Sequence, residues 1–168
     1  LDSNGDGVVD AIYAGDLQGN VWKFAIDASG TGSTDNCPSA KWKKDKLVFQ
    51  TPSVTCRTKS VTGVISTCSS PTTKRQPISA PIEVSSAQSG QAGGVMLFFG
   101  TGMYYQASDV NDMTQQAFYG IWDDNGNSAV TQAQLVQQTI DTESTISVVD
   151  QTTSQTVTFD YRLTSQNP

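Results

Sequence analysis

The chain has 168 residues, of which 36% are hydrophobic and 15% are charged, a size sufficient for one domain with its own core. Its net charge of −6 and pI near 4.3 argue against binding to nucleic acid, and without any apolar run of about 18 residues we expect no membrane insertion. Histidine is absent, which excludes a Ser-His-Asp triad, a His-ligated zinc site and a histidine general base within this chain.

The nonapeptide DSNGDGVVD, from Asp2 to Asp10, opens the chain. Oxygen-bearing side chains stand at alternate positions and a glycine then allows a sharp turn, which is the layout of a calcium loop. Crowded carboxylates repel one another, so we expect a cation, Ca²⁺, to order this loop. The alternative is a solvated Asp/Asn/Gly turn. The predicted metal ligands are Asp2, Asn4, Asp6, the backbone carbonyl of Val8, and Asp10.

The loop differs from an EF-hand. Its twelfth position is Tyr13, where an EF-hand has a bidentate Glu, and the residues that follow predict a strand. A calcium loop that runs into a strand is typical of loops between propeller strands. Because the chain opens inside this motif, we expect it to be a piece of a longer protein.

The next segment predicts a tight hairpin. Residues 12–14 form a short strand, and residues 21–26 alternate in the manner of a half-buried strand. In the turn between them, Asp16 is expected to accept hydrogen bonds from the backbone as an Asx motif, and Trp22 to pack between sheets.

Three cysteines, Cys37, Cys56 and Cys68, have spacings that fit no zinc module, and a secreted protein of this kind favours a disulfide. Spacing does not fix the pairing. We favour Cys56 with Cys68, which would close a hairpin within an inserted loop, and leave Cys37 free or paired outside the segment.

The second half of the chain predicts a series of short strands and turns. Residues 76–84 are extended with prolines typical of an edge, and the apolar run 95–102 predicts a central strand buried on both faces. The remaining expected elements are a strand at 47–51, a helical turn within 109–116, and strands at 117–122, 135–140, 145–149 and 156–163.

A second oxygen-rich cluster follows the strand at 117–122. It contains Asp123, Asp124, Asn125 and Asn127. Because these side chains do not alternate as ligands should, we favour a turn over a metal site there. Repeated hairpins of short strands indicate an all-β fold, either a β-propeller or a sandwich.

Five motifs in order resemble the C-terminal domain of the PilY/PilC family of type IV pilus tip proteins. They are DSNGDGVVD (2–10), YAGDLQGNVWKF (13–24), RQPI (75–78), FFGTG (98–102) and FYGIWD (118–123). The resemblance runs from the first residue to about residue 140. It implies a modified, quinoprotein-like β-propeller with antiparallel blades, long loops and at most one or two short helices, and it implies the same calcium ligands.

On this basis we expect one partial propeller domain over residues 1–168. Its regions are the calcium loop and first blade (1–51), the Cys-containing insertion (52–75), the second blade region (76–140) and a C-terminal hairpin (141–168). The resemblance also implies roles in pilus biogenesis, in the control of extension and retraction, and in surface adhesion. Its implied partners are pilins or minor pilins at the pilus tip, a host or abiotic surface, and the rest of the propeller.

The same resemblance implies a non-enzymatic protein that is secreted through the periplasm of a Gram-negative bacterium to the pilus and cell surface. Two alternatives stay open. Ala14, Asp16, Gly19 and Trp22 resemble the blade-packing signature of quinoprotein dehydrogenases, although it occurs once. A generic calcium-stabilised propeller of the integrin α-chain type would carry several calcium loops, whereas this chain has one.

Overall fold

The computed structural model describes residues 1, 9–26, 42–87 and 93–167. The described chain is nearly all antiparallel β-structure with two short 3-10 helices, as predicted for an all-β fold. It divides into two compact units, Leu1–Gln132 and Ala133–Pro168, each considered separately below. Among the described residues, no helix has the length and apolar character needed to cross a membrane.

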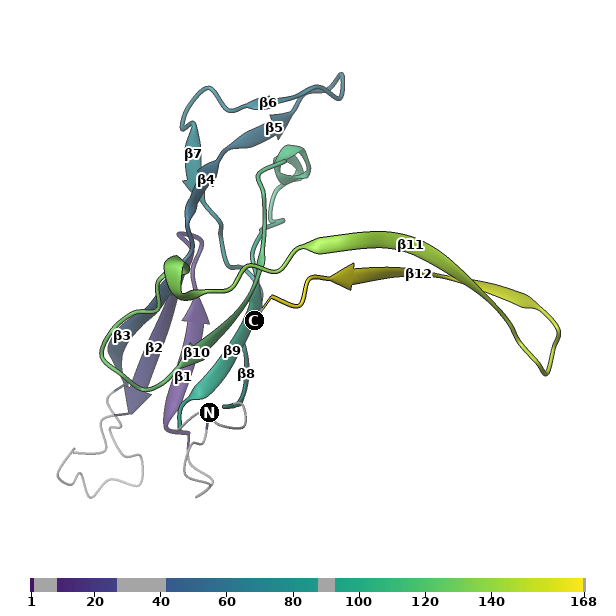
Figure 1. The fold of residues 1–168 in the computed structure, drawn as a ribbon. Helices are drawn as coiled ribbons and strands as arrows, with labels where there is room; N and C mark the ends of the chain where they lie inside the picture. Colours follow the sequence, from purple (N-terminus) through teal and green to yellow (C-terminus); the bar gives the residue numbers. More distant parts are fainter. Residues whose placement is uncertain (2–8, 27–41, 88–92, 168) are drawn as a thin grey trace. The chain divides into compact units, whose positions relative to one another are not determined.

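Two three-stranded antiparallel sheets form the body of the first unit (Figure 1). The first sheet has the order β1-β2-β3, and the second has the order β10-β9-β8. Their strands are β1 (Ala11–Gly15), β2 (Asn20–Ile26), β3 (Trp42–Gln50), β8 (Glu83–Ser86), β9 (Val95–Gly100) and β10 (Phe118–Asp123).

The hairpin between β1 and β2 is confirmed, together with the Asx turn at Asp16. One carboxylate oxygen of Asp16 accepts the backbone N–H groups of Gln18 at 2.8 Å and Asn20 at 2.9 Å. The other accepts the Trp22 indole N–H at 3.0 Å. Gly19 has a φ of 76°, and a Cβ at this position would lie 1.9 Å from the Thr51 hydroxyl oxygen. The turn therefore requires glycine here.

A β-bulge in β3 brings two consecutive apolar residues into the core. Val21 pairs with Phe49 and Trp22 pairs with Leu47, so Val48 has no partner in the ladder. Its carbonyl instead accepts the N–H of Val130 at 2.7 Å. Without this irregularity the period of two would direct Val48 and Phe49 to opposite faces, but both are fully buried.

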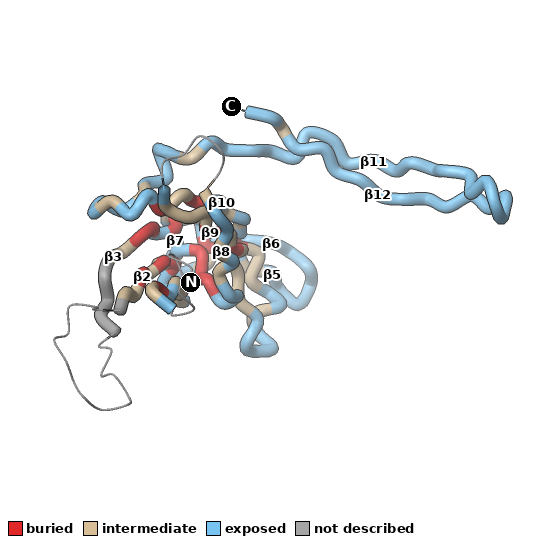
Figure 2. Tube along the Cα trace, turned by 90° about the horizontal axis from the view of Figure 1, so that it is seen from below, coloured by how far each residue is buried: buried red, intermediate tan, exposed pale blue. Residues whose placement is uncertain are grey.

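The core between the sheets contains an aromatic cluster. The Phe49 ring lies 5.1 Å from the Tyr119 ring and 6.2 Å from the Phe99 ring, and the last two are 5.4 Å apart. These tilted and offset contacts are the geometry that aromatic pairs favour. Figure 2 shows the buried residues gathered along the strands of these sheets.

β9 is the middle strand of its sheet, as predicted, but the prediction of burial on both faces is wrong. Leu97 and Phe99 are fully buried, while Met96 and Phe98 on the opposite face are half-buried. The reason is the antiparallel setting, in which one face meets the other sheet and the second face does not. A continuous apolar run cannot distinguish this arrangement from burial on both sides.

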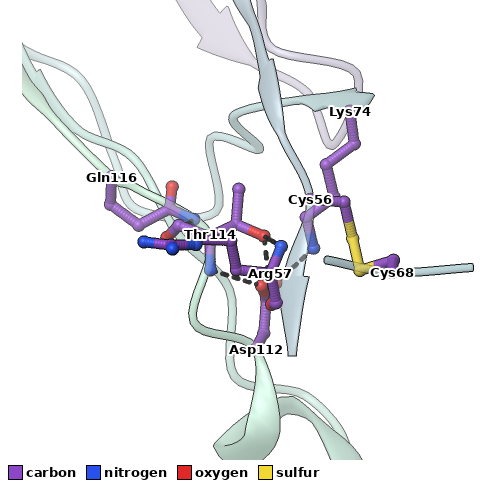
Figure 3. Close-up of a disulfide and its surroundings, with 7 residues drawn as sticks. All are labelled: Cys56, Arg57, Cys68, Lys74, Asp112, Thr114 and Gln116. Atoms are coloured by element: carbon purple, nitrogen blue, oxygen red, sulfur yellow. Dashed lines mark hydrogen bonds and ion pairs between the residues drawn. A yellow bond between two sulfur atoms is a disulfide. The ribbon is translucent and has the colours of Figure 1, made fainter. Parts of the chain in front are cut away.

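The cysteine-bearing insertion forms a finger of two small hairpins, residues 53–75. β4 (Ser53–Thr55) pairs with β7 (Thr73–Arg75), and β5 (Arg57–Lys59) pairs with β6 (Ile65–Thr67). The predicted disulfide between Cys56 and Cys68 is confirmed, with a Cα–Cα distance of 5.4 Å, at the junction between the two hairpins (Figure 3). Cys37 lies outside the described residues.

A buried threonine attaches the finger to the segment that follows the first 3-10 helix, Ala107–Asn111. The hydroxyl oxygen of Thr114 accepts the Arg57 N–H at 3.1 Å, and the Met113 N–H donates to the Arg57 carbonyl at 2.8 Å (Figure 3). Lys74 forms an ion pair with Asp112 beside this contact. Burial alone raises the pKa of Asp112, but the hydrogen bonds from Lys74 and Thr114 hold it below its usual value.

The second unit is a long two-stranded ribbon. β11 (Ile140–Val149) pairs with β12 (Thr156–Thr164), which confirms the C-terminal hairpin. The prediction of a strand at 135–140 is wrong. A second 3-10 helix, Gln132–Gln134, is followed by residues without strand structure, and β11 begins only at Ile140. The division of the chain into one domain of four regions stays a prediction.

The aromatic cluster provides the first test. Replacing Phe49 with Ala should lower the free energy of unfolding by about 3–5 kcal/mol, because it removes a fully buried ring and leaves a cavity. Phe118, which is 73% exposed, is the matched control, and its change to Ala should cost about 0.5 kcal/mol or less. Urea unfolding of the two variants measures both, and equal losses would contradict this description of the core.

Candidate functional site

The described residues that flank the predicted calcium loop form its base. The backbone nitrogen of Leu1 donates to the Ala11 carbonyl at 2.8 Å, and the Ala11 N–H returns a bond to the Leu1 carbonyl at 3.2 Å. The Asp10 N–H also donates to the Leu1 carbonyl, at 2.8 Å. These bonds place Leu1, the residue before the nonapeptide, beside Asp10, its last residue.

Only one of the predicted calcium ligands can be placed. Asp10 is half-buried and directly precedes β1. The other four, Asp2, Asn4, Asp6 and Val8, lie outside the described residues. Within the described part of the chain, no group of three or more Asp, Glu, Cys or His side chains could hold a metal ion.

The second oxygen-rich cluster forms a turn, and its carboxylates are already in use. The Asp124 carboxylate accepts the Gly126 N–H at 2.7 Å and so closes the turn after β10. Asp123 is the last residue of β10, and its side chain is only 1% exposed. It faces lysines of the first sheet, so cationic side chains take the place that a metal would need.

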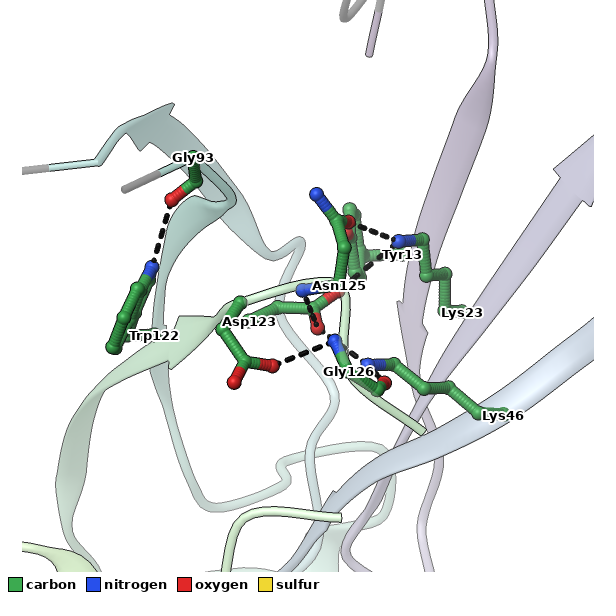
Figure 4. A network of polar contacts seen from close by, with 9 residues as sticks. Tyr13, Lys23, Lys46, Gly93, Trp122, Asp123, Asn125 and Gly126 are labelled. Atoms are coloured by element: carbon green, nitrogen blue, oxygen red, sulfur yellow. Dashed lines mark hydrogen bonds and ion pairs between the residues drawn. The ribbon is translucent and has the colours of Figure 1, made fainter. Parts of the chain in front are cut away.

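A buried polar network, here called the Asp123 hub, joins the two sheets (Figure 4). The Asp123 carboxylate accepts hydrogen bonds from Lys46 Nζ at 2.6 Å, from the Tyr13 hydroxyl at 2.7 Å and from Lys23 Nζ at 3.2 Å. Lys23 Nζ also donates to Asn125 Oδ1 at 2.7 Å, and Lys46 Nζ donates to the Gly126 carbonyl. β1, β2 and β3 thus each contribute one partner to a carboxylate of β10.

The electrostatics of the hub favour an ionised carboxylate. Burial on its own raises the pKa of Asp123, but hydrogen bonds from Lys46 and Tyr13 and the charges of both lysines hold it below its usual value of 3.8. The hub contains two ammonium groups for one carboxylate, which leaves an excess positive charge. The carbonyl oxygens of Asn125 and Gly126 accept the remaining protons of the lysines.

A cavity of about 810 Å³ opens beside the hub. Tyr13, Lys23 and Asn125 line one side, and residues 84–87 and 93–95 line the other. Leu1 and Ala11 also border it, so the residues that flank the predicted calcium loop and the hub share one cavity. The cavity therefore connects the side chains of Tyr13, Lys23 and Asn125 with solvent.

Sequence reasoning did not identify the hub. It assigned Lys23 to one face of an alternating strand together with Val21, and it assigned Asp123 to a turn. The structure buries that face, with Val21 fully buried and Lys23 9% exposed, while Trp22 is half-buried. A lysine in register with a core valine was the available signal, because a buried ammonium needs an acidic partner.

The chain is similar in sequence to a family of known proteins. The family model described as the PilY1 beta-propeller domain matches residues 1–154. The type IV pilus biogenesis factor PilY1 of Pseudomonas aeruginosa (strain UCBPP-PA14) is 32% identical over 99% of this chain, which spans 14% of that protein. A PilY1 homolog of Xylella fastidiosa is 32% identical over 82% of this chain, which spans 8% of that protein.

A solved structure shares the fold. The crystal structure of the Pseudomonas aeruginosa PilY1 C-terminal domain superimposes with a TM-score of 0.67 at 24% identity, covering all of this chain and 33% of the solved one. The predicted all-β propeller architecture is thereby confirmed. The chain spans well under a fifth of the length of the curated relatives.

The hub predicts a pH-dependent contribution to stability. Replacing Asp123 with Asn should cost about 3–5 kcal/mol at pH 7, because the largely buried ammonium group of Lys46 loses its counterion. The folded-state pKa lies below the usual 3.8, so the carboxylate stabilises the fold above that pH and the contribution is lost as the pH falls through the folded-state pKa.

Urea unfolding of both proteins at several pH values checks this prediction. The difference between wild type and Asp123→Asn should stay constant from pH 7 to pH 5 and shrink below about pH 4. Asp16 and Asp112 also have lowered pKa values, but they are common to both proteins and cancel in the difference. A difference that is unchanged in acid would show that the carboxylate charge has no role.

Proposed function

Because this chain belongs to the PilY1 beta-propeller domain family, whose model matches residues 1–154, we propose that it is a calcium-binding module of a type IV pilus biogenesis protein. The observation that carries the pilus role is the 32% identity to a type IV pilus biogenesis factor over 99% of the chain. The protein acts at the pilus and cell surface in pilus biogenesis, in the balance of extension and retraction, and in adhesion.

The donor set of the loop supports the calcium part of the proposal. Three carboxylates, one amide and one backbone carbonyl are the hard oxygen ligands that Ca²⁺ takes in proteins. The residues that would hold the ion are Asp2, Asn4, Asp6, Val8 and Asp10. The paired backbone bonds of Leu1 and Ala11 hold the residue before the ligand series beside the residue after it, which supports a closed loop.

The position of the loop suggests how calcium affects the fold. When bound, the ion supplies positive charge that offsets the repulsion among the carboxylates. Asp10 leads directly into β1, and three residues later the Tyr13 hydroxyl donates to Asp123. Ordering the loop therefore stabilises β1, the strand that reaches the hub. The surface that the domain presents to a partner is stabilised with it.

The partners in this proposal are pilins or minor pilins at the pilus tip, a host or abiotic surface, and the rest of the propeller. The role is non-enzymatic. The curated relatives are named as biogenesis factors, which supports this assignment over a quinoprotein dehydrogenase.

Calcium binding is tested by calorimetric titration of Ca²⁺ into the wild type and the variant Asp6→Ala. We expect micromolar-to-millimolar affinity in the wild type and at least about tenfold weaker binding in the variant, which loses one charged ligand. Asp124→Ala is the matched control from the second oxygen-rich cluster, and it should titrate like the wild type. Equal heats for the wild type and Asp6→Ala would reject this loop as the site.

The pilus role is tested separately in the organism that encodes the chain. Deleting the segment corresponding to residues 1–168 from the full-length protein should reduce surface pili severalfold, measured as pilin sheared from the cells. Asp6→Ala in the full-length protein separates the two claims, because it weakens calcium binding and leaves the whole segment in place. Normal piliation and normal surface attachment after the deletion would contradict the pilus role while leaving the calcium site unaffected.

A further inference from the structure

Lys23 and Asn125 place an amine against a carboxamide at the edge of the Asp123 hub. Lys23 Nζ lies 2.7 Å from Asn125 Oδ1, and the two residues are 102 positions apart in the sequence. The same Nζ lies 3.2 Å from Asp123 Oδ2. A nucleophile, an electrophilic amide and a carboxylate that can transfer a proton therefore meet at one point, and Figure 4 shows all three side chains converging.

We propose that Lys23 and Asn125 become joined by an intramolecular isopeptide bond. Lys23 Nζ attacks Asn125 Cγ, the Nζ–Cγ bond forms, and the bond from Cγ to Nδ2 breaks. The products are a secondary amide between the two side chains and ammonia, which leaves as ammonium with the two protons that Nζ gives up. No atom is oxidised or reduced, so the reaction needs no co-reactant.

The geometry distinguishes the two lysines of the hub. Both form ion pairs with the same carboxylate, that of Asp123. Lys46 holds the closer ion pair, 2.6 Å from Asp123 against 3.2 Å for Lys23. Lys23 Nζ also contacts the Asn125 carboxamide, so Lys23 is the amine that is placed to attack, whereas Lys46 contacts Asp123 and the Gly126 carbonyl.

Asp123 is placed to act as the proton carrier. Its Oδ2 atom faces Lys23 Nζ, so it can accept a proton from the attacking amine and pass it to the departing nitrogen. Its Oδ1 atom accepts the backbone N–H of Asn125 at 3.2 Å, which fixes the turn that presents the carboxamide. The cavity lined by Lys23 and Asn125 gives ammonia a way out.

A competing reaction exists at the same asparagine. Gly126 follows Asn125, and attack of the Gly126 backbone nitrogen on Asn125 Cγ would form a succinimide, also with loss of ammonia. The Gly126 N–H is engaged with the Asp124 carboxylate at 2.7 Å, which holds it away from this attack. The two reactions have the same mass change, so the experiment must separate them.

The test is the intact mass of the purified chain after reduction of the disulfide and denaturation. An isopeptide bond lowers the mass by about 17 Da, the mass of ammonia, relative to the sequence. Tryptic digestion should then yield one branched peptide containing both Lys23 and Asn125, which tandem fragmentation identifies. Lys23→Arg retains the positive charge but lacks the amine, so it should show the full sequence mass.

Two further variants complete the design. Asn125→Ala should also show its full sequence mass, whereas Lys59→Arg, a change at an exposed finger lysine, should keep the loss of about 17 Da. Mass is measured on denatured protein, so the reading itself does not require a folded variant. Lys23→Arg also keeps the positive charge at this position of the hub. A wild type at full sequence mass would overturn the proposal, and a loss of about 17 Da that persists in Lys23→Arg would assign the change to the succinimide instead.

Discussion

The carboxylate of Asp123 is the interaction on which the packing of the two sheets depends. It ends β10, yet its partners come from β1, β2 and β3, so one side chain connects every strand of the first sheet to the second. Apolar packing around Phe49 also joins the sheets, but it is not directional. The directional bonds of the hub fix how the sheets meet, because a buried carboxylate tolerates few other arrangements.

The sequence predicted the elements whose signals are local. Turn chemistry at Asp16 and the alternating pattern of residues 21–26 were sufficient for the first hairpin, and the short cysteine spacing favoured the correct disulfide. Errors arose where distant parts of the chain decide the outcome. The apolar run 95–102 did not reveal that only one of its faces meets a second sheet.

The candidate site likewise has one part that local sequence predicts and one part that it does not. The predicted calcium loop rests on nine consecutive residues, because ligand spacing is a local property. The hub depends on contacts between residues about 80 to 110 positions apart, and neither a lysine within a strand nor an aspartate before a turn reveals its partner. The sequence prediction packed the Trp22 face of the strand between the sheets, and only the structure shows that Lys23 is buried beside Val21.

The disulfide of the finger has a mechanical consequence. Cys56 and Cys68 are 12 positions apart, and the covalent bridge between them carries tension past the β5–β6 hairpin. If the chain is pulled from outside the finger, the residues between the two cysteines do not extend until the bridge is reduced. Their extended length exceeds the 5.4 Å that already separates the two Cα atoms by about 35 Å. Thiol reductants would then release this length as one discrete step in a force–extension trace.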